Sequence, residues 1–278
     1  MINFDSTTIL STEKPIFVFA SGHRCGSTLL QRLLNSCPDV LVWGEQNGYL
    51  SPFVRNFKTL LEWEAKFSSQ RKTFLTKGFN NFVPNMLPED HELITAARIY
   101  LVSLFGAPAA KLGKRIWGFK EVRYGINVAF FLQELFPKAR FIHLTRNVID
   151  CFISMKHWED SNDPWNRQWT EKSIENWQII NEDFFEAADH LNKFFHVKYE
   201  QMVDNPDGFA EALSDFLELP LSSFDRSVFQ IRLHGQEYRG KNDREKMLPS
   251  DLNDEEKALL SRDNIVRTAE KYNYRIEF

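Results

Sequence analysis

The sequence predicts an α/β protein, a single domain in which a mostly parallel central sheet is flanked by helices. Three observations predict this class. Short apolar runs typical of buried strands recur at 16–20, 40–43, 116–120, 140–145 and 194–199. Segments with helical apolar spacing separate them, at 26–35, 127–136, 148–158, 165–191, 209–217 and 255–272. No Pro/Gly/Ser-rich linker divides the 278 residues, a length that one α/β domain can fill.

The composition is typical of a folded protein in a reducing compartment. Hydrophobic residues make up 43% of the chain and charged residues 26%, which argues against a disordered or fibrous protein. Three cysteines are too few for a disulfide framework, and no apolar run reaches the roughly 18 to 20 residues that span a bilayer. Because no such span and no signal-peptide core is seen, the chain is expected to be cytoplasmic, and its net charge of -4 argues against a nucleic-acid or membrane partner.

The first elements along the chain are a strand, a tight loop and a helix. The apolar run 16–20 leads into a Gly/Ser-rich loop, and leucines at helical spacing follow until Cys37-Pro38 ends the helix. This order places the N–H groups of a helix N-terminus beside the loop, where they attract an anion. The second strand, 40–43, is followed closely by Glu45.

Residues 46–112 are expected to form a helical insertion within the single domain 1–278, with breaks at Pro84, Pro88 and Pro108. Six phenylalanines of this segment are expected to pack in the core rather than to line an acceptor pocket. They are Phe53, Phe57, Phe67, Phe74, Phe79 and Phe82. Strands and helices alternate again after the insertion, and the polar segment 235–250 is expected to be an exposed basic loop.

The loop GHRCGST at residues 22–28 has the composition of a phosphate site. Two glycines permit a tight turn, Arg24 provides a cation, and Ser27 and Thr28 provide hydroxyl groups. The alternative is a purely structural role for this loop, as an ordinary Gly/Ser turn with a helix cap. A nucleotide kinase of the Walker A type needs a lysine in this loop, but the spacing is one residue short and Ser27 stands at that place.

The segment RCGSTLL at residues 24–30 resembles the 5'-phosphosulfate loop of sulfotransferases that use 3'-phosphoadenosine 5'-phosphosulfate (PAPS). Cys25 stands where that family usually has serine. The similarity continues through Pro38-Asp39-Val40 and Glu45, and there it is closer to the tyrosylprotein and heparan-type branch than to the cytosolic phenol and steroid branch. It covers roughly residues 15 to 220 and implies the P-loop-like sulfotransferase fold.

The resemblance also implies roles for individual residues. Donor binding is assigned to Arg24, Cys25, Gly26, Ser27, Thr28, Leu29, Arg146, Ser154, Tyr199, Arg239 and Lys241. Within this set, Arg146 and Ser154 would bind the 3'-phosphate and Tyr199 would contact the adenine side. Arg239 and Lys241, in the basic loop, would close over the 3'-phosphate. No metal is expected, because the cations and amides supply the charge stabilisation.

Two residues are the candidates for catalysis. Lys120 follows a strand and would stabilise the departing phosphate, and Glu45 would take the proton of the acceptor. Arg24, Lys120 and Arg146 all come after strands, and ligand sites in open α/β sheets gather at the carboxyl ends of the strands. In the structural alternative, Lys120 is a solvated residue paired with Glu121. A histidine, His23 or His143, is the alternative base, although a packed role is expected for both.

The expected function is therefore transfer of a sulfuryl group from PAPS to a hydroxyl or amine of a small-molecule, glycan or peptide acceptor. A P-loop small-molecule or nucleoside kinase is the alternative enzyme, and a non-catalytic nucleotide-binding protein is the alternative outside catalysis. The net charge of -4 does not oppose an anionic ligand. Segments 22–32, 114–123 and 138–156 carry ten basic and two acidic residues, a net charge of +8, which leaves -12 for the rest of the chain.

Overall fold

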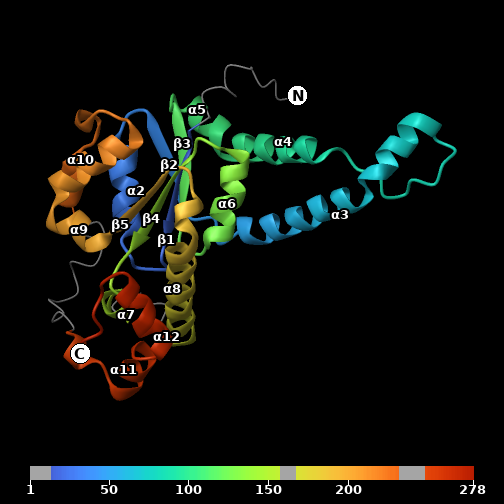
Figure 1. Ribbon diagram of the computed structural model, residues 1–278. Coiled ribbons are helices and arrows are strands. Elements are labelled where there is room, and N and C mark those ends of the chain that lie inside the picture. The colour runs from blue at the N-terminus through green and yellow to red at the C-terminus, as the bar shows by residue number, and fades with distance from the viewer. Residues whose placement is uncertain (1–13, 157–166, 232–247) are drawn as a thin grey trace.

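The computed structural model describes residues 14–156, 167–231 and 248–278. Its centre is a five-stranded parallel sheet with the order β2-β3-β1-β4-β5 (Figure 1). The strands are β1 (Ile16–Ala20), β2 (Val40–Trp43), β3 (Ile116–Glu121), β4 (Arg140–Thr145) and β5 (Phe194–Lys198). All five coincide with the predicted apolar runs, and the predicted fold class, a single α/β domain with a parallel sheet, is confirmed.

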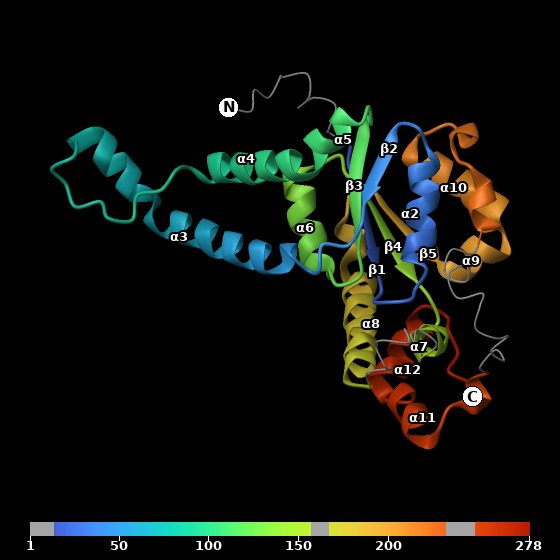
Figure 2. The same cartoon turned by 180° about the vertical axis from the view of Figure 1, so that it is seen from behind.

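Both faces of the sheet are buried, which explains why the strands are continuously apolar. In β1, Ile16 and Val18 point into one hydrophobic cluster, whereas Phe17 and Phe19 point into the other. All four side chains have no exposed surface, and burial of each contributes about 1.5 to 3 kcal/mol to folding. Helices α2 and α10 cover the first face, and α4 and α6 cover the second (Figures 1 and 2).

The helices follow the predicted pattern, with differences at their ends. They are α2 (Ser27–Ser36), α3 (Leu50–Lys77), α4 (Asp90–Leu101), α5 (Ala107–Lys111), α6 (Ile126–Leu135), α7 (Val148–Lys156), α8 (Arg167–Ala187), α9 (Tyr199–Asp204), α10 (Pro206–Leu217), α11 (Asp254–Leu260) and α12 (Asp263–Lys271). Shorter helical turns are η1 (Val102–Gly106), η2 (Ala188–His190), η3 (Leu221–Ser223), η4 (Arg226–Phe229) and η6 (Pro249–Asp251). Two helices, α11 and α12, replace the single helix predicted at 255–272, and Tyr199 begins a helix instead of ending a strand.

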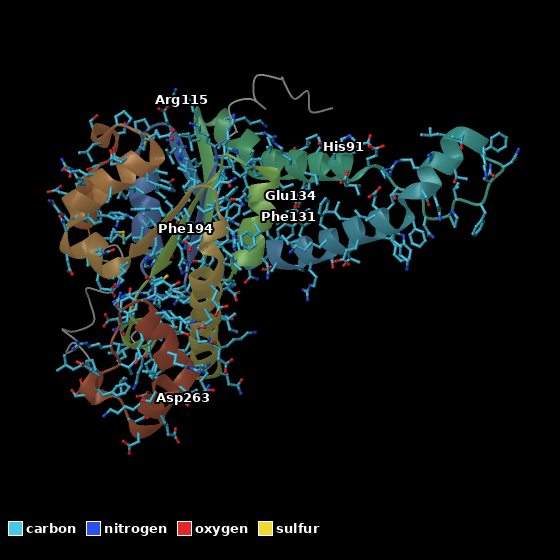
Figure 3. All side chains as sticks on the ribbon, viewed as in Figure 1. His91, Arg115, Phe131, Glu134, Phe194 and Asp263 are labelled. Carbon is cyan, nitrogen blue, oxygen red and sulfur yellow. The ribbon has the colours of Figure 1, made fainter. Side chains whose placement is uncertain are left out.

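Helices α3 and α4 form a long hairpin that projects from the sheet (Figures 1 and 2). Its base packs on α6, where the ring of Phe131 lies 6.0 Å from that of Phe53 and 5.4 Å from that of Phe57 (Figure 3). Phe79 and Phe82 lie outside this core. They are 83% and 91% exposed, so the prediction that they pack in the core is wrong.

The predicted break at Pro108 does not end the helical run that begins at Asp90. A π-helical turn, η1, precedes α5, and Pro108 lies in the first turn of α5, where its missing N–H costs little. An 18-residue window within the run Asp90–Lys111 has a mean hydropathy of 1.5, so by length and composition alone this run is apolar enough to cross a membrane. Its Leu101 and Phe105 nevertheless pack into the core beneath the sheet.

Candidate active site

A cavity of about 1020 Å³ lies beyond the carboxyl ends of β1, β3 and β4. Nine of the predicted site residues line it: Arg24, Gly26, Ser27, Thr28, Leu29, Glu45, Arg146, Ser154 and Tyr199. Lys120 adjoins it through contacts with Ser27 and Glu45. Arg239 and Lys241 lie outside the described residues. Parallel strands therefore bring together residues that are more than 170 positions apart in the sequence.

The loop after β1 is shaped by residues in the left-handed backbone region. Gly22 and Gly26 have φ angles of 92° and 91°, and Arg24 adopts 64°. A Cβ atom on Gly26 would lie 2.2 Å from Cδ2 of Tyr199, so only glycine lets this ring pack on the loop. The loop ends at the N-terminus of α2, which faces the cavity and favours an anion.

Cys25 contributes its backbone rather than its side chain to the loop. The thiol is fully buried and donates a hydrogen bond to the carbonyl oxygen of Gly22 at 3.0 Å. Burial raises the pKa of Cys25 to about 11, so the thiol stays protonated at neutral pH. A serine-like side-chain contact with a ligand is therefore excluded in this conformation.

Two arginines converge beside the loop. Arg24 Nε donates a hydrogen bond to Ser154 Oγ at 3.1 Å, and Arg146 Nη1 donates one to the carbonyl oxygen of Arg24 at 2.9 Å. Burial, followed by the positive charge of Arg146, lowers the pKa of Arg24. Nε of Arg146 is buried without a hydrogen-bond partner among the described residues. An anionic ligand would relieve the repulsion and satisfy this donor, because buried polar groups are normally paired.

The aromatic ring of Tyr199 lies against Arg146. The guanidinium carbon of Arg146 is 4.3 Å from the ring centroid, a cation–π distance. The next residue, Glu200, accepts a hydrogen bond from the backbone N–H of Asn147 at 3.0 Å and fixes the start of α7 against α9. Tyr199 therefore supports Arg146 and closes one side of the loop.

Lys120 and Glu45 form a half-buried ion pair at the centre of the site. Lys120 is 5% exposed, and its Nζ donates hydrogen bonds to Glu45 Oε1 at 2.5 Å and to Ser27 Oγ at 3.3 Å. The alternative in which a solvated Lys120 pairs with Glu121 is wrong, because successive residues of β3 point to opposite faces. Burial raises the pKa of Glu45, but the hydrogen bonds and charges of Lys120 and Arg123 outweigh it, and the net pKa is lowered.

Glu121 instead organises the backbone behind Glu45. Its carboxylate is fully buried and accepts hydrogen bonds from the N–H groups of Gln46 at 2.9 Å and Gly48 at 3.0 Å. Arg123 donates to Glu121 at 2.7 Å and to Glu45 at 3.1 Å, so one guanidinium joins both carboxylates. Arg123 was not among the predicted site residues, although its position three residues after Lys120 was a signal.

The two histidines that were alternative bases have different environments. His143 is fully buried, contacts the carbonyl oxygen of Phe19 and Asn181, and burial lowers its pKa to about 3. It is a core residue. His23 lines the cavity, and burial and the charge of Arg123 lower its pKa. Arg123 Nη2 lies 3.0 Å from Nε2 of His23, so this ring nitrogen accepts the hydrogen bond of the guanidinium.

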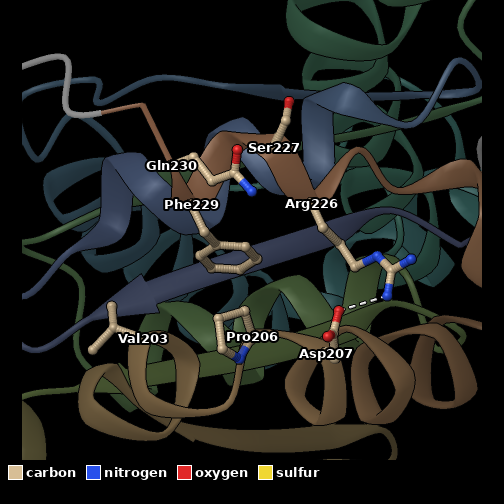
Figure 4. Close-up of a pocket in the computed structure, with 7 residues that line it drawn as sticks. All are labelled: Val203, Pro206, Asp207, Arg226, Ser227, Phe229 and Gln230. Carbon is tan, nitrogen blue, oxygen red and sulfur yellow. Dashed lines mark hydrogen bonds and ion pairs between the residues drawn. The ribbon is translucent and has the colours of Figure 1, made fainter.

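One part of the cavity is lined by apolar side chains. These residues are Leu29, Val203, Phe229 and Ile231, of which only Leu29 was predicted. Arg32 lies beside them and donates a hydrogen bond to the carbonyl oxygen of Ile231 at 3.0 Å. A second pocket of about 570 Å³ adjoins this part and shares Val203 and Phe229 with it (Figure 4). Across it, Arg226 forms an ion pair with Asp207 at 2.5 Å. The site thus offers a cationic part and an apolar part to one ligand. In the described ranges, no group of three His, Cys, Asp or Glu side chains could hold a metal ion.

Comparisons with known proteins agree with this arrangement. The profile of the sulfotransferase family matches residues 15–223. No curated protein matches the chain significantly. Among solved structures, the sulfotransferase domain of the Synechococcus PCC 7002 olefin synthase has a TM-score of 0.53 and 16% identity, over 95% of this chain and 96% of that chain. The sulfotransferase domain from the curacin biosynthetic pathway has a TM-score of 0.52 and 16% identity, over 95% and 99% of the two chains.

A sulfotransferase from Alicyclobacillus acidocaldarius is similar to the same degree, with a TM-score of 0.51 and 13% identity over 93% of this chain and 94% of that chain. At these identities the likeness concerns the fold. The family profile, in contrast, spans well over half of the chain and includes the loop after β1, Glu45, Lys120, Arg146 and Tyr199. The chain belongs to the sulfotransferase family, whose members are enzymes that transfer a sulfuryl group.

Proposed function

We propose that the protein uses PAPS as its sulfuryl donor and transfers the group to a hydroxyl or amine of an acceptor. The observation that carries this proposal is the pair of arginines beside the N-terminus of α2. Arg24 and Arg146 lie together, and the buried Nε of Arg146 has no partner among the described residues. A nucleotide with two separate phosphate groups fits these cations better than a nucleotide with one.

The residues of the cavity fit such a donor from end to end. Ser27, Thr28 and the N-terminus of α2, with the backbone of Cys25 and Gly26, would hold the 5'-phosphosulfate. Arg146 and Ser154 would hold the 3'-phosphate, and Arg24 would join the loop in holding the 5'-phosphosulfate. The adenine would occupy the apolar part beside Leu29 and Phe229, where a flat ring gains most from burial. Arg239 and Lys241 remain candidates for closing the site.

Bound PAPS supplies the sulfuryl group, whose bond to the phosphate oxygen breaks as the bond to the acceptor forms. Lys120 would donate to the oxygen that leaves with the phosphate and stabilise its growing negative charge. Glu45 would take the proton from the acceptor as it attacks. When Lys120 turns to the donor, Glu45 loses its strongest hydrogen bond. One of the contributions that lower the pKa of Glu45 is then removed, so this carboxylate becomes a stronger base than in the free enzyme.

The acceptor would approach Glu45 from the side of His23 and Trp169, whose rings lie 4.8 Å apart at the cavity wall. Its class stays open among small molecules, glycans and peptides. We infer donor and base residues like those of the tyrosylprotein and heparan-type branch from the segment around Glu45, and this branch assignment stays a prediction. A cytoplasmic location also stays a prediction. A kinase is not favoured, because Ser27 occupies the position of the phosphate-binding lysine.

A transfer assay with sulfur-labelled PAPS tests the proposal. The purified protein is incubated with the donor and a panel of phenols, amines, oligosaccharides and tyrosine peptides, and the Glu45→Gln variant serves as the control for contaminating activity. We expect label to appear in at least one acceptor with the wild type and to fall strongly with the variant. Binding of ATP with magnesium in preference to 3',5'-adenosine bisphosphate would contradict the proposal.

A further inference from the structure

The turn of the α3–α4 hairpin displays large apolar side chains to solvent. We refer to residues 65–88, the last part of α3 and its connection to α4, as the hairpin tip. It is the part of the hairpin farthest from the sheet in both views (Figures 1 and 2). Phe82 is 91% exposed, Phe79 83% and Leu75 77%. Three such residues close together mark a contact surface, because single exposed apolar residues are ordinary but a cluster is not.

The hairpin tip also has its own charge. It contains Lys66, Arg71, Lys72 and Lys77 and no carboxylate, a net charge of +4 in a chain whose total is -4. Arg71 pairs with Glu64, just before the tip, at 2.8 Å and with Glu89, just after it, at 3.5 Å, so the charge that the tip offers to a partner is that of its lysines. Lys72 and Lys77 are exposed on the same stretch as Leu75. The hairpin tip of this acidic protein therefore exposes both lysines and large apolar side chains to solvent.

The connection is built so that these side chains stay outside. The backbone N–H of Gly78 donates to the carbonyl oxygen of Phe74 at 2.8 Å and ends α3. Asn81 Nδ2 donates to the carbonyl oxygen of Lys77 at 2.9 Å, and the N–H of Asn85 donates to Gln70 Oε1 at 2.9 Å. These bonds join the turn to the end of α3, while Leu75, Phe79 and Phe82 remain exposed and available to a partner.

We propose that the hairpin tip binds the surface of an anionic lipid bilayer. Phe79, Phe82 and Leu75 would enter the interfacial region, and the lysines would pair with anionic headgroups, the two contributions that hold a peripheral protein on a membrane. A symmetric contact between two tips would bring like charges together, which disfavours a second copy as the occupant. The expectation of no membrane partner rested on the net charge, which averages the tip with an acidic remainder.

Co-sedimentation with vesicles tests this proposal on the full chain. Phosphatidylcholine vesicles with and without phosphatidylglycerol are compared for the wild type, Phe79→Ser/Phe82→Ser and Lys72→Glu/Lys77→Glu. We expect the wild type to bind the anionic vesicles. Each double variant should bind them at least about tenfold more weakly. Added salt should weaken binding of the wild type. Matched controls are Ile179→Ser, 52% exposed on α8, and Lys111→Glu on α5, both of which should bind like the wild type.

Affinity for 3',5'-adenosine bisphosphate should be the same in all variants, because the tip does not line the nucleotide cavity. This measurement also shows that each variant is folded. Absence of wild-type binding to anionic vesicles would overturn the proposal, as would equal binding by the tip variants. Sedimentation velocity without lipid covers the other occupant. A wild-type dimer that the Phe79→Ser/Phe82→Ser substitutions dissociate would identify the tip as a protein interface and overturn the proposal.

Discussion

Nζ of Lys120 and Oε1 of Glu45 lie 2.5 Å apart, so the cation at the end of β3 and the carboxylate after β2 are in direct contact. This contact is shorter than the hydrogen bond of Glu45 to Arg123, at 3.1 Å, and that of Lys120 to Ser27, at 3.3 Å. The contact lowers the pKa of Glu45 against the effect of burial and holds Lys120 beside Ser27 at the start of α2. The proposed acid–base chemistry depends on separating this pair when the donor binds.

Replacement of Glu45 tests the proposed base. We expect Glu45→Gln to lower kcat by roughly a hundredfold or more, the usual contribution of a general base. Affinity for 3',5'-adenosine bisphosphate should change little, because the amide keeps the shape of the carboxylate. Steady-state kinetics and calorimetry measure the two quantities. A fully active variant would show that another group, such as His23, takes the proton.

The pH dependence of kcat/KM tests the cause of the lowered Glu45 pKa. Glu45 must be ionised to take a proton, so the rate should fall as the pH drops through its pKa, which lies below the usual value in the free enzyme. In Arg123→Gln one of the two cations is lost, the pKa of Glu45 rises, and the acid limb moves to higher pH. The control is Arg226→Gln, which removes a cation that pairs with Asp207 instead of Glu45. An acid limb at the same pH in Arg123→Gln and the wild type would contradict this account.

Glu121 tests how the segment after β2 is positioned. In Glu121→Ala the N–H groups of Gln46 and Gly48 lose their buried acceptor, which should cost about 2 to 4 kcal/mol of the free energy of unfolding. Urea denaturation measures this loss. Glu211→Ala on the exposed side of α10 is the control and should change the stability by less than about 0.5 kcal/mol. Equal stability of the two variants would show that these bonds contribute nothing.

Gly26 tests the fit between the loop and Tyr199. In Gly26→Ala the new methyl group would meet the Tyr199 ring, and the ring and Arg146 would have to move. We expect nucleotide affinity to fall by at least about tenfold. Gly113→Ala provides a matched control, because Gly113 has a similar φ of 74° and no atom within 4 Å of the added group. If the nucleotide affinity of Gly26→Ala equalled that of Gly113→Ala, the proposed fit between Gly26 and the Tyr199 ring would be refuted.

Much of this organisation could be predicted from the sequence, because it depends on local patterns. The strands are predictable since each is a short apolar run buried on both faces, and the loop after β1 since glycine, arginine and hydroxyl residues precede a helix. Phe229 could not be predicted, because its place at the cavity depends on contacts made by distant segments. The predicted break at Pro108 was wrong because a π-helical turn precedes α5 and places Pro108 in the first turn of that helix, where proline is tolerated.

The exposed phenylalanines of the hairpin tip show a second limit of the sequence. Phe53 packs on α6, whereas Phe82 faces solvent, and nothing in the local sequence distinguishes an insertion that folds back from one that projects. Burial of a phenylalanine of α3 is decided by whether it lies beside α6. Composition alone therefore assigns too many of these residues to the core.

The central claim, that the arginine pair recognises a nucleotide with a 3'-phosphate, is tested most directly by calorimetry of Arg146→Ala. Binding of 3',5'-adenosine bisphosphate and of adenosine 5'-monophosphate is measured for the variant, the wild type and the control Arg115→Ala, whose arginine is exposed and pairs with Asp39. We expect Arg146→Ala to weaken the bisphosphate by about tenfold or more and the monophosphate much less, because a charge-assisted contact to one phosphate is lost. Unchanged bisphosphate affinity, or an equal loss for both nucleotides, would contradict the account.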